Sequence, residues 1–123
     1  MKNSFCHIEL NTDNVGKAKE FYGTLFSWKV EDTDMGGMKY TTITPGEGPA
    51  GGIMQKPMAE APNMWLVYVQ VDKIDATLKK VEKLGGKVIV PRTPLPNIGA
   101  FSIIQDPTGA TFGIWEPQPK TKK

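Results

Sequence analysis

Two stretches of sequence decide the fold: residues 7–13, HIELNTD, and residues 66–72, LVYVQVD, which begin 59 positions apart. Each is typical of an apolar strand that ends at an aspartate able to cap a helix. Each half also closes on a glycine-isoleucine strand, Gly52-Ile53-Met54 and Gly113-Ile114-Trp115. This internal repeat predicts two copies of one supersecondary unit about an approximate two-fold axis, with any ligand site between the copies.

Each copy is expected to hold a strand, a helix and three further strands. Asp13 or Thr12 is predicted to cap the first helix and Asp72 the second, and Gly85 is predicted to end the second helix. The apolar positions at helical spacing are Val15, Ala18, Phe21, Tyr22, Leu25 and Phe26 in the first helix, and Ile74, Leu78, Val81 and Leu84 in the second. Gly36-Gly37, Pro45-Gly46 and Asp106-Pro107-Thr108-Gly109 are expected turns, while Pro91, Pro94 and Pro96 predict an extended loop rather than a strand.

Composition indicates one globular domain with a core of ordinary size. The 123 residues include 39% hydrophobic side chains, 15 basic residues and 13 acidic residues. Three of the lysines follow residue 119, so the body has 12 basic residues against 13 acidic ones and no basic face typical of nucleic-acid binding. Residues 1–119 are expected to form the domain, with modules at 5–55 and 64–116, a linker at 56–63, and a disordered polar tail at 117–123. The single cysteine and the polar start favour a cytoplasmic protein outside the membrane.

Strand alternation assigns the faces of the first strand of each copy. Cys6, Ile8 and Leu10 share the face that packs on the helix, so His7 and Glu9 lie on the other face. In the second copy, Val67, Val69 and Val71 are the helix-packing residues, whereas Leu66, Tyr68 and Gln70 point away. Polar side chains on the inner face of central strands are unusual for a dry core and predict a ligand cavity.

The repeat and two tracts, residues 21–28 (FYGTLFSW) and residues 106–113 (DPTGATFG), resemble the vicinal oxygen chelate superfamily. This superfamily includes glyoxalase I, extradiol dioxygenases, and fosfomycin- and bleomycin-resistance proteins. The resemblance covers about residues 5–116 and implies an α+β fold. In that fold, two βαβββ modules in pseudo-two-fold arrangement form a curved sheet around a central pocket, usually in a dimer. The chain looks most like the small glyoxalase-like domains that also occur in tandem.

The resemblance also implies where metal ligands would stand: on the first and last strands of each module. His7 fits the first of these positions, but Leu66 stands at its counterpart, and Gly52 and Gly113 stand at or beside the last-strand positions. A catalytic divalent metal needs about three protein ligands. We therefore expect no metal ligands and no cofactor, and a divalent metal remains an alternative.

His7 and Glu9 are the best polar pair and the candidate catalytic residues, either as a base with its orienting partner or as a structural pair. The predicted ligand-binding residues are His7, Glu9, Tyr68, Gln70, Tyr40 and Trp115. Cys6 lies on the opposite face from His7 and is expected to be an inert thiol. The segment 46–51, which matches G-x-G-x-x-G, lacks a following helix and is interpreted as a hairpin loop.

These observations favour a small-molecule-binding, glyoxalase- and bleomycin-resistance-like protein without the superfamily metal site, whose reaction is undefined. One alternative is a metal-dependent, glyoxalase-like lyase or a dioxygenase, and another is an antibiotic-sequestering resistance protein. The near-neutral body disfavours cationic bleomycin-type ligands. A homodimer is expected from the resemblance alone, and neither a nucleic acid nor a membrane is expected as a partner.

Overall fold

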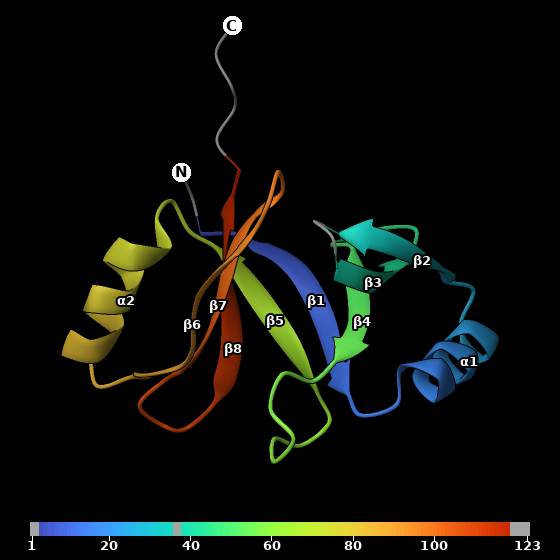
Figure 1. The fold of residues 1–123 in the computed structure, drawn as a ribbon, viewed down its shortest axis with the longest axis horizontal. Coiled ribbons are helices and arrows are strands. Elements are labelled where there is room, and N and C mark those ends of the chain that lie inside the picture. Colours follow the sequence, from blue (N-terminus) through green and yellow to red (C-terminus); the bar gives the residue numbers. More distant parts are fainter. Residues whose placement is uncertain (1–2, 36–37, 119–123) are drawn as a thin grey trace, which may run out of the picture. The chain divides into compact units, whose positions relative to one another are not determined.

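The part of the chain that the structure describes contains ten elements, which repeat one pattern twice (Figure 1). The computed structural model describes residues 3–35 and 38–118. The first five elements are β1 (Phe5–Thr12), α1 (Val15–Leu25), β2 (Lys29–Met35), β3 (Met38–Thr44) and β4 (Gly51–Gln55). The other five are β5 (Met64–Gln70), α2 (Ile74–Lys83), β6 (Lys87–Leu95), β7 (Gly99–Gln105) and β8 (Thr111–Pro117). The predicted α+β fold with two βαβββ modules is confirmed. By compactness the chain divides into two units, Cys6–Val67 and Tyr68 onward together with the residues up to Phe5.

Both modules pair their strands in the same way. The first strand of each lies parallel to the last, β1 beside β4 and β5 beside β8, and the remaining neighbours are antiparallel. The order is β2-β3-β4-β1 in the first module and β5-β8-β7-β6 in the second. The register places Glu9 beside Gly52 in one module and Tyr68 beside Gly113 in the other. In both copies, a residue in the middle of the first strand therefore lies next to a glycine of the last strand.

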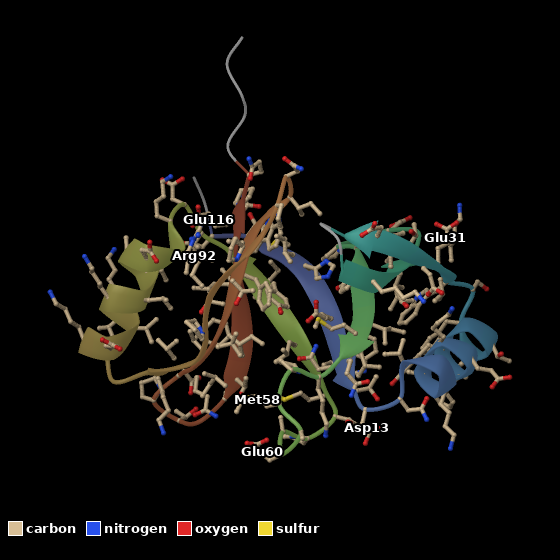
Figure 2. The ribbon with its side chains drawn as sticks, in the orientation of Figure 1. Asp13, Glu31, Met58, Glu60, Arg92 and Glu116 are labelled. Carbon is tan, nitrogen blue, oxygen red and sulfur yellow. The ribbon has the colours of Figure 1, made fainter. Side chains whose placement is uncertain are left out.

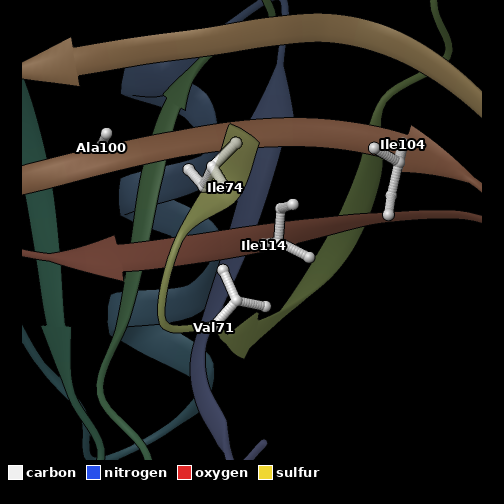
Figure 3. Close-up of a cluster of buried hydrophobic side chains, with 5 residues drawn as sticks. All are labelled: Val71, Ile74, Ala100, Ile104 and Ile114. Carbon is white, nitrogen blue, oxygen red and sulfur yellow. The ribbon is translucent and has the colours of Figure 1, made fainter. Parts of the chain in front are cut away.

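The core of the second unit lies under α2 (Figure 3). It consists of Val71, Ile74, Ala100, Ile104 and Ile114, all at most 6% exposed. Leu78 and Val81 from the predicted helix stripe pack against this cluster, but Leu84 is 75% exposed and the prediction was wrong for it. Leu84 is the C-cap, beyond the last helical turn, where the 3.6-residue spacing no longer applies. Gly85 follows with φ of 89°, the left-handed conformation that ends helices, as predicted.

The first unit has a corresponding core of Leu10, Ile43 and Ile53. Within the predicted stripe of α1, Val15, Ala18 and Tyr22 pack on that core, whereas Phe21, Leu25 and Phe26 are exposed. Trp28 also packs there and stacks on Tyr22, as expected for a core residue. Trp65 also meets the Tyr22 ring edge-on, and its Nε1 donates to the Tyr22 hydroxyl at 3.3 Å.

Both predicted helix caps were wrong. Asn14 caps α1, because its Oδ1 accepts the backbone N–H of Lys17, while Thr12 instead accepts the N–H of Asn14 through its hydroxyl. Lys73 is the N-cap residue of α2 and makes no side-chain cap. The carboxylate of Glu116 on β8 takes that role, since its Oε1 accepts the N–H of Ile74 at 2.9 Å.

Glu116 is also paired with Arg92 of β6, whose Nη2 lies 3.4 Å from Oε2 (Figure 2). The N–H of Ile74 and the Arg92 guanidinium hold the pKa of this carboxyl below its usual value, although burial of the group opposes them. One buried carboxylate therefore links β8, β6 and the start of α2.

The proline-rich segment is a strand, not the extended loop that the prolines predicted. β6 includes Pro91 and Pro94, and its pairing with β7 shifts register twice, between Val88 and Val90 and between Val90 and Thr93. β6 stands at the end of its strand order. An edge strand with bulges tolerates residues that lack a backbone N–H, which explains why the prolines do not end it.

The loops agree with their sequence signals where the structure describes them. Asp106 accepts the backbone N–H groups of Thr108 and Ala110 and the Thr108 hydroxyl, which closes the predicted turn. The segment 46–51 joins the antiparallel strands β3 and β4 with no helix, as expected. The predicted turn at residues 36–37 and the end of the tail, residues 119–123, lie outside the described residues. Within the described ranges, no helix is long and apolar enough to cross a membrane.

We predict that Glu116→Gln lowers the free energy of unfolding by about 1–2 kcal/mol at neutral pH, because the charged cap of α2 and the ion pair are lost. Since folding lowers the pKa of Glu116, its stabilisation is present above the usual pKa of a glutamate and is lost as the pH falls through the folded value. Urea unfolding curves of the two proteins should therefore converge in acid.

The matched control for this experiment is Glu60→Gln, in the exposed linker (Figure 2), which should change stability by less than about 0.5 kcal/mol. An equal effect of the two substitutions at neutral pH would show that Glu116 does not cap α2.

Candidate functional site

Three polar side chains of β1 share one face of the strand: His7, Glu9 and Asn11. They alternate with Ile8 and Leu10, and Leu10 packs in the core beneath α1. The prediction that His7 and Glu9 face away from the helix is thus confirmed. Asn11 was missed, although it lies two residues beyond Glu9 and has the same parity.

Tyr40 of β3 joins His7 to Glu9. The Tyr40 hydroxyl lies 2.7 Å from Nε2 of His7 and donates to Oε1 of Glu9 at 2.8 Å. Nδ2 of Asn11 donates to the other carboxylate oxygen at 2.8 Å. The direct distance from His7 to Glu9 is 4.0 Å, too long for a hydrogen bond, so the tyrosine is the bridge between them. We call His7, Glu9, Asn11 and Tyr40 the polar cluster.

Gly52 makes this bridge possible. Strand β4 lies between β3 and β1, so Tyr40 must cross it to reach Glu9, over about 9–10 Å of sheet. Gly52 is the β4 residue directly beside Glu9, and a Cβ at this position would overlap the ring and hydroxyl of Tyr40. The phenol therefore occupies the space that any side chain at residue 52 would need.

The second module repeats this arrangement of glycine and tyrosine. A Cβ at Gly113 of β8 would overlap the ring of Tyr68, which is its register neighbour on β5. Tyr68 is 3% exposed and meets Phe101 edge-on, with ring centroids 6.5 Å apart. In both modules, the glycine of the last strand is thus covered by a buried tyrosine.

The remaining predicted site residues belong to the second unit. Gln70 and Trp115 are register neighbours on β5 and β8, and both are partly buried. Among the predicted site residues, hydrogen bonds within residues 6–67 bring together His7, Glu9 and Tyr40. Whether Tyr68, Gln70 and Trp115 serve the same ligand remains a prediction.

Burial controls the charge of His7. Loss of water around the ring lowers the pKa of His7 below the usual value for histidine. The nearby charge of Glu9 raises this pKa, but its effect is smaller than that of burial. The imidazole is therefore neutral at neutral pH. Cys6, on the other face of β1, has its thiol pKa raised by burial, which makes it a poor nucleophile, as expected.

Comparison with known proteins agrees with the repeat and the topology. The family model described as Glyoxalase/Bleomycin resistance protein/Dioxygenase superfamily matches residues 4–114. The chain belongs to this superfamily. Superfamily membership accounts for the paired modules. It also raises the question of whether the residues at the expected metal-ligand positions could bind a metal.

Two relatives are similar in sequence. CFP32 of Mycobacterium bovis, described as a candidate glyoxylase, is 35% identical over 113 residues, 91% of this chain and 43% of that protein. The anthracycline biosynthesis protein DnrV of Streptomyces peucetius is 33% identical over 128 residues, covering 88% of this chain and 45% of DnrV. The chain thus spans less than half the length of these superfamily relatives. A hypothetical protein of Bacillus halodurans, BH1468, shares the fold over all of both chains, with a TM-score of 0.68 at 16% identity.

Apart from His7, the residues at or beside the superfamily's expected metal-ligand positions do not fit a metal. Leu66 is apolar and 1% exposed, and Gly52 and Gly113 offer no donor and are covered by tyrosines. The described hydrogen bonds already engage Nε2 of His7 and both oxygens of Glu9. Across residues 3–35 and 38–118, no group of three or more His, Cys, Asp or Glu side chains could hold a metal ion.

We predict that Gly52→Ala lowers the free energy of unfolding by about 2–3 kcal/mol, because the new methyl group and the Tyr40 ring need the same space. In a Tyr40→Ala background the same change should cost much less, so a double-mutant cycle should give a coupling energy above about 1 kcal/mol. Gly23→Ala in α1 is the matched control. It has room for a Cβ and should raise stability by about 0.5–1 kcal/mol. A Gly52→Ala protein as stable as wild type would contradict the packing described.

We also predict that the pKa of His7 lies below the usual value for histidine and falls further in Glu9→Gln, because that variant removes the charge that favours imidazolium. The chain has one histidine, so its ring proton gives a single resolved NMR titration. Folding lowers this pKa, so as the pH drops the unfolded chain takes up the His7 proton before the folded chain does. The free energy of unfolding should therefore decrease as the pH falls through the usual histidine pKa. A pKa unchanged or raised in Glu9→Gln would refute the electrostatic coupling.

Proposed function

We propose that the chain is a small-molecule-binding domain of the superfamily that works without the superfamily metal site. Its ligand is anchored by the polar cluster. The observation that carries this proposal is the bridge from His7 through Tyr40 to Glu9, built over Gly52. The resemblance to the superfamily implies a metal ligand at or beside this glycine. We propose that the hydrogen-bonded side chains of the polar cluster do here what a bound metal does in metal-using members, which is to hold the ligand.

Exposure supports His7 as the member that meets the ligand. Its side chain is 28% exposed, whereas that of Glu9 is 7% exposed and Tyr40 is 6% exposed overall. A ligand therefore reaches the imidazole first, and the buried members orient it. Tyr68, Gln70 and Trp115 are proposed to supply further ligand contacts, with dimerisation of the domain expected as elsewhere in the superfamily.

The names of the relatives suggest two probes. Because one relative is described as a candidate glyoxylase, the hemithioacetal of methylglyoxal and glutathione tests for lyase activity with and without added metal. Because another is an anthracycline biosynthesis protein, the fluorescent anthracycline doxorubicin tests for binding of an aromatic polyketide. The doxorubicin titration also tests the alternative function of antibiotic sequestration.

We predict that calorimetric titration with Ni²⁺, Zn²⁺ and Mn²⁺ detects no stoichiometric binding that depends on His7, because the donors of the cluster are engaged with one another. We further predict that His7→Ala lowers the affinity about tenfold, or by about 1.4 kcal/mol, for whichever of the two probes the wild-type protein binds. The same substitution should lower the free energy of unfolding little. Tyr22→Phe, which changes a tyrosine on the opposite side of the first module's sheet, should bind as wild type does.

One equivalent of metal that is lost in His7→Ala, together with metal-dependent turnover of the hemithioacetal, would replace this proposal with a metal-dependent lyase. Large destabilisation by His7→Ala would instead show that the imidazole is a core residue.

A further inference from the structure

The outer side of α1 carries a continuous apolar surface. Phe21 and Leu25 are 57% and 56% exposed, and since they lie four residues apart they are neighbours on one face of the helix. Phe26, the C-cap residue of α1, is 44% exposed, and Trp65 of β5 is 37% exposed. We call these four residues the apolar patch.

Two half-buried aromatic residues, Tyr22 and Trp28, join the members of the patch. The Tyr22 ring meets Phe21 and Trp65 edge-on, with ring centroids 5.0 Å and 5.3 Å apart. The ring centroid of Phe26 lies 4.7 Å from that of Trp28. Because Tyr22 and Trp28 also pack on the core of the first unit, the exposed side chains form one surface supported from beneath.

The corresponding helix of the second module has a charged outer side. With 59 positions between the two copies, Phe21 corresponds to Lys80 and Leu25 to Leu84. Leu84 is 75% exposed, but its neighbours in the last turn of α2 include Lys80 and Lys83, which are exposed as well. The module therefore folds without an apolar outer side on its helix, and the patch on α1 needs a different explanation.

The exposed area of the patch matches what one partner contributes to a stable dimer. Its four side chains leave roughly 400 Å² in contact with water, if a fully exposed side chain of this size presents about 200 Å². A standard interface buries about 800 Å² on each partner, and somewhat more than half of that area is apolar. The patch thus supplies nearly all the apolar area that one side of such an interface requires.

The charges beside the patch are balanced. The charged residues of α1 and of the first four residues of β2 are three basic and three acidic ones: Lys17, Lys19, Lys29, Glu20, Glu31 and Asp32. Lys19 pairs with Asp32 at 3.1 Å, and Lys29 pairs with Glu31 at 3.7 Å. Such a surface meets a copy of itself across a two-fold axis without net repulsion. A nucleic acid or an anionic membrane would instead require an excess of basic residues.

We propose that the apolar patch is the surface through which two copies of this chain associate, patch against patch across a two-fold axis. The patch lies on the α1 side of the first module, whereas His7 and Glu9 face away from α1. The association therefore leaves the polar cluster on the other face of its sheet. This inference goes beyond the proposed ligand binding and is independent of it, and it gives the expected dimer a defined interface.

Sedimentation equilibrium from micromolar to millimolar protein concentration tests the proposal. We expect the wild-type protein to form a dimer in this range. Phe21→Lys places in α1 the residue that α2 has at the corresponding position, and it should weaken dimerisation about tenfold or more, as should Leu25→Lys. The matched control is Leu84→Lys, which makes the same change at an exposed leucine of α2 and should dimerise as the wild type does.

Two further measurements separate lost association from lost folding. Thermal unfolding of dilute, monomeric protein should be nearly the same for the wild type and the three variants, because the replaced side chains are more than half exposed. In the wild-type protein, the indole N–H signal of Trp65 in a ¹H–¹⁵N spectrum should shift as the protein concentration rises. In Phe21→Lys it should not shift over the same range.

Three results would overturn the proposal: a wild-type protein that is monomeric throughout, a dimer that persists in Phe21→Lys and Leu25→Lys, or a dimer that Leu84→Lys weakens equally. If the wild-type protein is monomeric, co-sedimentation with phosphatidylcholine vesicles tests the other occupant. Vesicle binding that Phe21→Lys abolishes would assign the patch to a lipid surface instead. Each of these results leaves the proposed ligand binding standing, because the His7→Ala titrations test it separately.

Discussion

The absence of a side chain at Gly52 is the constraint on which the candidate site depends. Tyr40 reaches Glu9 from a strand that is not its neighbour, and the strand between them must leave room for an aromatic ring. The second module satisfies the same condition with Gly113 and Tyr68. The two glycines, at corresponding places in the repeat, are thus requirements of packing, and neither offers a side chain that could bind a metal.

Local patterns in the sequence predicted the part of the site that lies within one strand. Alternation put His7 and Glu9 on the face away from α1, and the same rule applied one step further would have found Asn11. Tyr40 was foreseen as part of a pocket wall. Its role as a bridge depends on the β3-β4-β1 order and on the register that places Gly52 beside Glu9. The residue pattern of a single strand predicts neither the strand order nor the register.

The errors in the fold have a similar origin. Helix-capping rules consider residues next to the helix, so they chose Asp72, whereas the group that binds the first N–H of α2 lies 42 residues further along the chain. The prolines of β6 were read as breaking a strand because the sequence does not show that this strand lies at an edge. Pattern rules succeeded for the core positions Val71, Ile74 and Leu10, whose burial is set by period alone.

Glu116 has a consequence for how the protein is made. The core of the first unit, Leu10, Ile43 and Ile53, lies within residues 6–67, so this core can form while the rest of the chain is still being synthesised. The second unit cannot do so, because the carboxylate that satisfies the start of α2 emerges in the last strand and β5 also pairs with that strand. During translation, the first turn of α2 therefore stays uncapped until β8 has been synthesised, so the two halves of the repeat, alike in topology, complete their packing at different times.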